Sequence, residues 1–141
     1  MTPDTTNHRH DDATLKSQTA VVLLAHGSRD PAWLEWFQGL SSSLADSLGA
    51  GRVRTAYLQF SPPTLPEAIT AAANDGFRKI AVLPIFISAG GHATRDVPQQ
   101  VAAAQEQFSG LEITVMPRIG QTPGFEELIR NLTIEASEVR H

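Results

Sequence analysis

The sequence predicts an α/β fold in which a four-stranded parallel sheet of strand order 2-1-3-4 lies between two layers of helices. Short apolar runs alternate with amphipathic helical patterns in the order βαβαβαβα, and the loops between them are short. Residues 20–25 are apolar at every position, as in a strand covered on both faces. The strand order is assumed by analogy with doubly wound flavodoxin-like sheets, since alternation alone does not fix it.

The first helix and the second strand have separate signals. Asp30 followed by Pro31 is typical of an N-cap and a first helical position, and apolar residues then recur at helical spacing over 31–48. Residues 52–60 are rich in strand-forming side chains. We therefore expect a helix over 31–48 and a strand over 52–60.

The middle of the chain predicts a second helix and a third strand. Thr64 and Glu67 match a capping box, which begins a helix, and Gly76 ends it. An apolar run over 79–84 predicts the next strand. Pro84 has no backbone donor, so the hydrogen-bonded ladder is expected to end or bulge there.

The last part of the chain repeats the pattern. A glycine-containing loop over 88–96 precedes a predicted helix over 97–108, and a fourth strand is expected over 111–116. A final helix is expected to begin at 122–123. Its apolar face consists of Phe125, Leu128, Ile129 and Leu132.

Composition excludes several classes of protein. The chain has no cysteine, which excludes disulfides and thiolate sites and fits a reducing compartment. The net charge is −4, and acidic and basic residues nearly balance over 20–120. The sequence has no basic stripe, which argues against a nucleic-acid-binding module. The longest apolar runs fall short of the ~20 residues that a membrane-spanning helix needs.

The N-terminal segment has a different character. Residues 1–18 are polar and aperiodic, so we expect a disordered leader followed by a single domain over 19–141. His8 and His10 fit a solvated tail better than a metal-collecting tract. The segment lacks the apolar core of a secretory signal, and we therefore expect a cytoplasmic protein.

Two histidines inside the predicted domain mark a candidate site. His26 directly follows the first strand, and His92 lies in the loop after the third. In a 2-1-3-4 sheet these two strands flank the position where the chain reverses its order, which is where open α/β sheets bind ligands. Each histidine is followed three residues later by an arginine, Arg29 or Arg95.

These residue types fit metal and anion chemistry. Two neutral imidazoles offer ligands for Co²⁺, Ni²⁺, Fe²⁺ or Zn²⁺ and a general base near neutral pH. Gly90 and Gly91 allow the backbone to approach a ligand closely, and Ser28 offers an anion contact. The alternative is that the histidines are ordinary loop or core residues and that the glycines only shape turns.

Arginines at strand ends point to a carboxylate ligand. Arg29, Arg95 and Arg118 all follow predicted strand ends, and guanidinium groups bind carboxylates through two parallel hydrogen bonds. Alternatively, Arg29 and Arg95 pair with their neighbouring aspartates. The phosphate-binding glycine motifs of nucleotide-binding proteins are absent from the sequence, which disfavours a flavodoxin-like nucleotide or phosphate binder.

At these loops the sequence resembles the small CbiX-type chelatases. Residues 24–31, LAHGSRDP, resemble the opening motif of that family, and residues 83–98, LPIFISAGGHATRDVP, resemble its second motif. The segment between them, AYLQFSPPTLPEA over 56–68, is similar to the family's middle segment. The resemblance covers about residues 20–135, and the second motif is the most specific.

The resemblance implies a chelatase-like fold, similar to class II chelatases and ferrochelatases. It implies ATP-independent insertion of Co²⁺, or in relatives Fe²⁺ or Ni²⁺, into the tetrapyrrole polycarboxylate sirohydrochlorin, on routes to cobalamin or sirohaem. His26 and His92 match the family's metal-binding and proton-accepting histidines. The metal is then a substrate, and no permanently bound cofactor is expected. The short forms resemble half of a two-domain chelatase and are expected to act as homodimers.

Gln59 departs from the family's pattern, in which an acidic residue is expected at that position. An amide does not accept a proton and is a poorer metal ligand, although it still offers hydrogen bonds to a substrate. This residue favours a second hypothesis, in which the chain is a tetrapyrrole- or metal-binding relative that has lost turnover.

Overall fold

The computed structural model describes residues 18–49, 51–88, 90–91 and 95–140. Four strands form one parallel sheet in the predicted order β2-β1-β3-β4. They are β1 (Thr19–Ala25), β2 (Val53–Tyr57), β3 (Lys79–Pro84) and β4 (Glu112–Val115). Leu24 of β1 lies opposite Ala56 of β2 and Pro84 of β3, so the carboxyl ends of these three strands are level.

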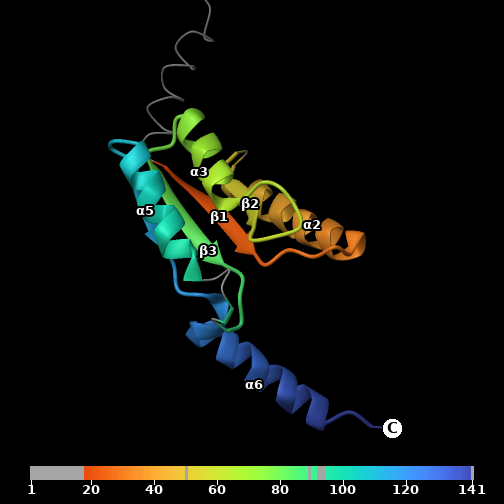
Figure 1. The fold of residues 1–141 in the computed structure, drawn as a ribbon. Helices are drawn as coiled ribbons and strands as arrows, with labels where there is room; N and C mark the ends of the chain where they lie inside the picture. Colours follow the sequence, from red (N-terminus) through yellow and green to blue (C-terminus); the bar gives the residue numbers. More distant parts are fainter. Residues whose placement is uncertain (1–17, 50, 89, 92–94, 141) are drawn as a thin grey trace, which may run out of the picture.

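The helices connect the strands as the sequence predicts. They are α2 (Pro31–Leu48), α3 (Leu65–Asn74), α5 (Val97–Gln107) and α6 (Pro123–Ser137), with a short 3₁₀ turn, η1 (Ile119–Gln121), before the last. In Figure 1, α3 and α5 lie on one side of the sheet and α2 lies on the other. The α6 helix runs away from the sheet, so it is not part of either layer.

The predicted helix starts are confirmed by their hydrogen bonds. The Asp30 carboxylate accepts from the Ala32 backbone N–H at 3.0 Å, ahead of Pro31 at the first helical position. In the capping box, Glu67 accepts from the Thr64 N–H at 2.8 Å, and the Thr64 hydroxyl accepts from the Glu67 N–H at 3.3 Å. These bonds, first of all the one from the Thr64 backbone, lower the pKa of the exposed Glu67 carboxyl below its usual 4.5.

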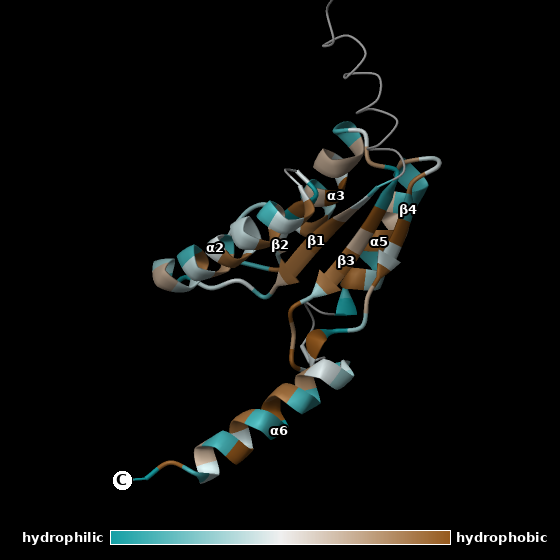
Figure 2. Cartoon of the chain, turned by 180° about the vertical axis from the view of Figure 1, so that it is seen from behind, coloured by the Kyte–Doolittle hydropathy of each residue, from teal (hydrophilic) through white to brown (hydrophobic). Residues whose placement is uncertain are grey.

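The two faces of the sheet are covered unequally. A cluster of 18 buried residues fills the side of α3 and α5, whereas the α2 side has four buried residues and a larger set that is only partly buried. In Figure 2 the strands carry mostly the colour of hydrophobic residues. The main core of the domain is therefore on the α3–α5 side.

The structure corrects the bounds of two strands. β2 ends at Tyr57 rather than at residue 60. The backbone continues beside β1 for two more residues, since Leu58 N–H donates to the Ala25 carbonyl, and then turns at Phe60, whose φ is +74°. β4 spans Glu112–Val115, within the predicted 111–116.

Two further sequence predictions concern the N-terminal leader and membrane-spanning helices. The predicted leader lies outside the described residues except for Gln18, so its disorder and the boundary at residue 19 stay predictions. Within the described part of the chain, no helix has both the length and the apolar character to cross a membrane.

Candidate functional site

His26 lies one residue beyond β1, at the end of the sheet where the chain order reverses between β1 and β3. Its side chain is exposed, and its imidazole lies against the ring of Phe86, with ring centroids 4.4 Å apart. Phe86 is buried and follows β3, which stays beside β1 because Ile85 N–H donates to the Leu24 carbonyl at 2.8 Å. The loops after β1 and β3 therefore meet at His26.

Gly27 joins the loop after β1 to the segment after β2. Its φ is +95°, a conformation that favours glycine, and a β-carbon here would overlap with the carbonyl oxygen of Gln59. The Gln59 N–H donates to the His26 carbonyl at 3.1 Å. The Gln59 backbone is thus fixed beside His26, while its side chain is exposed.

Ser28 and Asp30 shape the loop, and Arg29 stands out from it. The Ser28 hydroxyl accepts from the Asp30 N–H at 3.0 Å, and the Asp30 carboxylate caps α2. The exposed Arg29 guanidinium lies over the ring of Phe60, 4.8 Å from its centroid. Within the described residues the only ion pair is Arg54–Asp75, so the alternative in which Arg29 pairs with Asp30 is wrong here.

The second predicted loop is described only in part. His92 lies outside the described residues, so the structure does not test whether it faces His26. Gly90 and Gly91 are exposed, and Arg95 is exposed just before α5, without an ion pair to Asp96 among the described residues. In the same part of the chain, no group of three or more histidine and acidic side chains gathers to hold a metal ion.

Phe60 is a candidate site residue that the sequence reasoning missed. The sequence predicts Phe60 as the last residue of a strand. In the structure its side chain is 51% exposed, and its backbone adopts a left-handed conformation that is rare outside glycine. Backbone strain of this kind clusters at functional sites, where the surrounding structure maintains it. Through its contact with Arg29, the Phe60 ring adjoins the loop that begins at His26.

Arg118 and Phe86 both line a second hollow. The hollow has a volume of about 190 Å³ and lies at the carboxyl ends of β3 and β4, where it is also lined by Val97, Met116 and Gln121. The Arg118 Nε is inaccessible to solvent and has no hydrogen-bond partner among the described residues. A guanidinium placed in this way is suited to a carboxylate that enters the hollow.

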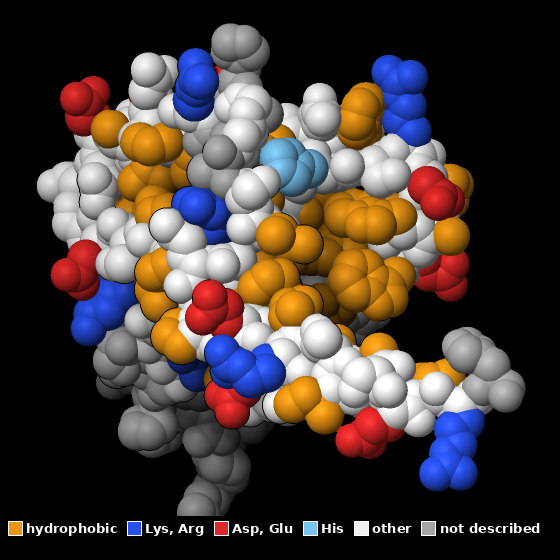
Figure 3. Space-filling model, turned by 90° about the horizontal axis from the view of Figure 1, so that it is seen from below, with side chains coloured by type: hydrophobic (Ala, Val, Ile, Leu, Met, Phe, Trp, Pro, Cys, Tyr) orange, Lys and Arg blue, Asp and Glu red, His pale blue; other side chains and the backbone are white. Residues whose placement is uncertain are grey.

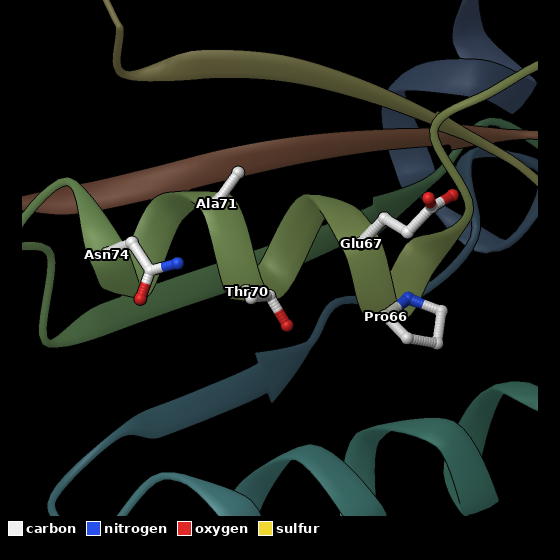
Figure 4. A pocket seen from close by; sticks show the side chains of 5 residues that line it. All are labelled: Pro66, Glu67, Thr70, Ala71 and Asn74. Atoms are coloured by element: carbon white, nitrogen blue, oxygen red, sulfur yellow. The ribbon is translucent and has the colours of Figure 1, made fainter.

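A larger depression, of about 370 Å³, lies along α3 (Figure 4). All the residues that line it belong to α3, and it includes none from the loops after β1 or β3. It is therefore a groove on one helix surface rather than part of the site. Figure 3 looks onto the carboxyl ends of the strands and shows a hollow lined by apolar side chains there.

Comparison with known proteins identifies relatives of the whole domain. The CbiX family model matches residues 20–136. A sirohydrochlorin cobaltochelatase of Methanosarcina barkeri is 29% identical over 124 residues, which cover 86% of this chain and 95% of that protein. One from Methanocaldococcus jannaschii is 33% identical over 87 residues, and there the match spans only 61% of the relative's length and 62% of this chain.

Solved structures share the fold. A putative cobalamin biosynthesis CbiX protein from Marinobacter aquaeolei superposes with a TM-score of 0.71 at 30% identity, covering 86% of this chain and 98% of that one. The sirohydrochlorin chelatase SirB from Bacillus subtilis subspecies spizizenii, solved with cobalt, also gives a TM-score of 0.71, at 21% identity. The match covers 86% of this chain and 51% of the SirB chain.

Proposed function

The chain belongs to the CbiX family, and from this premise we propose that it inserts a divalent metal ion into sirohydrochlorin without ATP. Co²⁺ is the expected metal, since the matched relatives are named cobaltochelatases, and Fe²⁺ or Ni²⁺ are the alternatives. The observation that carries the proposal is the position of His26, whose exposed imidazole lies at the reversal point of the sheet and against Phe86.

The chemistry requires a group that both holds a metal and accepts protons. Insertion releases two pyrrole protons for each divalent ion that enters the ring, and the ring nitrogens replace the ion's water ligands. A neutral imidazole supplies a nitrogen lone pair for either task near neutral pH. We assign this role to His26, with its ring orientation supported by Phe86, and to His92 as its partner.

A polycarboxylate substrate requires cations and donors around the metal. Arg29 and Arg95 are exposed in the two loops, and Arg118 lines a hollow together with Phe86. We assign them to the substrate's carboxylates, with further contacts from Ser28, Gln59, Gly90 and Gly91. Phe60 offers an aromatic surface to the face of the macrocycle.

Gln59 favours one competing function. Its backbone N–H donates to the His26 carbonyl, so position 59 adjoins the residue that we assign to the metal, and an acidic side chain there would add a proton acceptor to this part of the site. With an amide there, the chain would bind the tetrapyrrole or the metal and lack turnover. We further propose a homodimer in the cytoplasm, with the metal ion as substrate and no resident cofactor.

One experiment separates the two functions. Sirohydrochlorin is mixed with the protein and Co²⁺, Fe²⁺ or Ni²⁺ under anaerobic conditions, and the absorbance spectrum is followed. The proposal predicts catalytic conversion to the metallated spectrum, fastest with Co²⁺, above the rate without protein. A shifted spectrum that shows binding, with no acceleration for any of the metals, would establish the non-catalytic alternative.

A further inference from the structure

The His26 imidazole is oriented by its contact with Phe86. The two ring centroids lie 4.4 Å apart, and the ring planes are tilted by 37°. A histidine that binds a metal usually has a hydrogen-bond partner on its second ring nitrogen, and that partner fixes the orientation of the ring. Among the described residues no such partner is present, so the Phe86 ring is the contact that limits the rotamers of the exposed His26 side chain.

Two backbone hydrogen bonds hold the segment that carries Phe86. Before it, the Ile85 N–H donates to the Leu24 carbonyl at 2.8 Å, which keeps the segment beside β1. At Phe86 itself, the carbonyl accepts from the Gly120 N–H at 3.0 Å, and Figure 1 shows the η1 turn close to the end of β3. The position of the buried Phe86 side chain therefore depends on how closely η1 approaches this segment.

Gly120 allows an approach that no other residue type permits. A β-carbon on Gly120 would overlap with the carbonyl oxygen of Ile87 and would lie 2.8 Å from the Ile87 Cα. Unlike Gly27, Gly120 has a φ outside the left-handed region. The requirement for glycine at position 120 thus comes from the contact between two backbones alone.

A side chain added in η1 would displace the segment after β3 rather than η1 itself. The η1 turn is closed by the hydrogen bond from the Gln121 N–H to the Arg118 carbonyl at 2.9 Å, and Thr122 joins it directly to the capped start of α6. Phe86 and Ile87, in contrast, lie outside any helix or strand. The segment after β3 is therefore the part that gives way, and the Phe86 ring moves with it.

We propose that Gly120 is a positioning residue that acts through Phe86 on the His26 imidazole. The close approach of η1 seats Phe86, and the Phe86 ring sets the direction in which His26 presents a ring nitrogen to the metal. The inference rests on the assignment of His26 to the metal in the proposed function. It deepens that assignment, because it names a residue remote in the sequence on which the geometry of the metal ligand depends.

Metal affinity is the quantity that should change. Partners that orient a metal-binding histidine typically contribute about 10–100-fold to metal affinity. We expect Gly120→Ala to weaken the binding of Co²⁺ roughly tenfold, measured by calorimetric titration of the protein with Co²⁺ alone. Gly124→Ala is the matched control, because it adds the same methyl group four residues later, where nothing lies within 4 Å of it. This control should bind Co²⁺ as the parent chain does.

Nuclear magnetic resonance of the metal-free protein reports on the ring contact itself. The ring current of Phe86 shifts the resonances of the His26 ring protons, which are identified by their absence from the spectrum of His26→Ala. Phe86→Leu keeps an apolar side chain in the core and supplies the reference without a ring current. We expect the His26 resonances of Gly120→Ala to move toward those of Phe86→Leu, and those of Gly124→Ala to stay at the parent positions.

Two results would overturn the proposal. Parent-like His26 resonances in a folded Gly120→Ala chain would show that Gly120 does not position the ring. Phe86→Leu keeps the test decisive if Gly120→Ala does not fold, because parent affinity for Co²⁺ in Phe86→Leu would show that the ring contact does not orient a metal ligand.

Failure of this inference is distinguishable from failure of the proposed function. If the His26 resonances of the parent chain do not respond to Co²⁺, the assignment of His26 to the metal is contradicted. The comparison of Gly120→Ala with Gly124→Ala in the metal-free state then decides by itself whether Gly120 positions the ring. Unchanged resonances in Gly120→Ala, with a parent chain that responds to Co²⁺, contradict the positioning role alone.

Discussion

The backbone at Gly27 passes so close to the carbonyl oxygen of Gln59 that no β-carbon fits between them. This contact joins the loop after β1 to the segment after β2, and it fixes the backbone from which the His26 side chain extends. Because Gly27 also has a φ of +95°, two independent constraints require glycine at this position.

Substitution of Gly27 tests whether this contact positions the site. We expect Gly27→Ala to lose about 1–3 kcal/mol of stability through backbone strain and to lower the metallation rate by displacing His26. Gly39→Ala is the matched control, since nothing lies within 4 Å of its added methyl group in α2. Thermal unfolding and the metallation assay give the readouts, and unchanged values for Gly27→Ala would refute the role.

Phe60 should show opposite effects on stability and on binding. The left-handed backbone conformation of Phe60 costs roughly 1–2 kcal/mol of stability for a residue with a side chain. Glycine adopts this conformation without that cost. We therefore expect Phe60→Gly to raise the unfolding temperature and to weaken sirohydrochlorin binding, as measured by titration. Phe60→Tyr retains the ring and should bind as the parent does. Parent-like binding by Phe60→Gly would show that the ring does not contact the substrate.

Substitution of Arg118 should raise the KM for sirohydrochlorin more than the KM for the metal. A charge-assisted hydrogen bond contributes about 1.5–3 kcal/mol, so we expect Arg118→Gln to raise the KM for sirohydrochlorin about tenfold or more. The KM for the metal should stay within twofold. Arg78→Gln serves as the control, because Arg78 is exposed and precedes β3, at the far end of the sheet. Equal KM values for the two variants would remove Arg118 from the site.

Substitution of Gln59 tests whether this residue sets the metallation rate or the metal preference. Its backbone N–H donates to the His26 carbonyl, so Gln59→Glu introduces a carboxylate on a residue that adjoins His26. We expect the variant to metallate faster or to change its order of preference among Co²⁺, Fe²⁺ and Ni²⁺. The same rates and the same order of metals would show that position 59 has no part in the reaction.

Local signals in the sequence predicted the fold well because they act over a few residues. The apolar run at 20–25 and the Thr64–Glu67 capping box specify a buried strand and a helix start without help from distant residues. The strand order was assumed, and the observed sheet confirms it. His26 directly follows β1, so the observed strand order puts it at the reversal point, as expected.

Features that depend on contacts between distant residues could not be predicted from the sequence. The conformation of Phe60 is set by where the segment after β2 turns, which residue types do not encode. The steric requirement at Gly27 arises from Gln59, which is remote in the sequence. The periodicity of α6 predicts an apolar stripe, but it does not say what covers the stripe. His92 lies outside the described residues, so its place beside His26 stays a prediction.

The most direct test of the central claim is the metallation rate of His26→Ala with Co²⁺ and sirohydrochlorin. His8→Ala serves as a matched control, and circular dichroism confirms that both variants keep the fold. The account predicts that His26→Ala loses metallation to the level without protein, while His8→Ala retains the parent rate. A folded His26→Ala variant that inserts Co²⁺ at the parent rate would contradict the account.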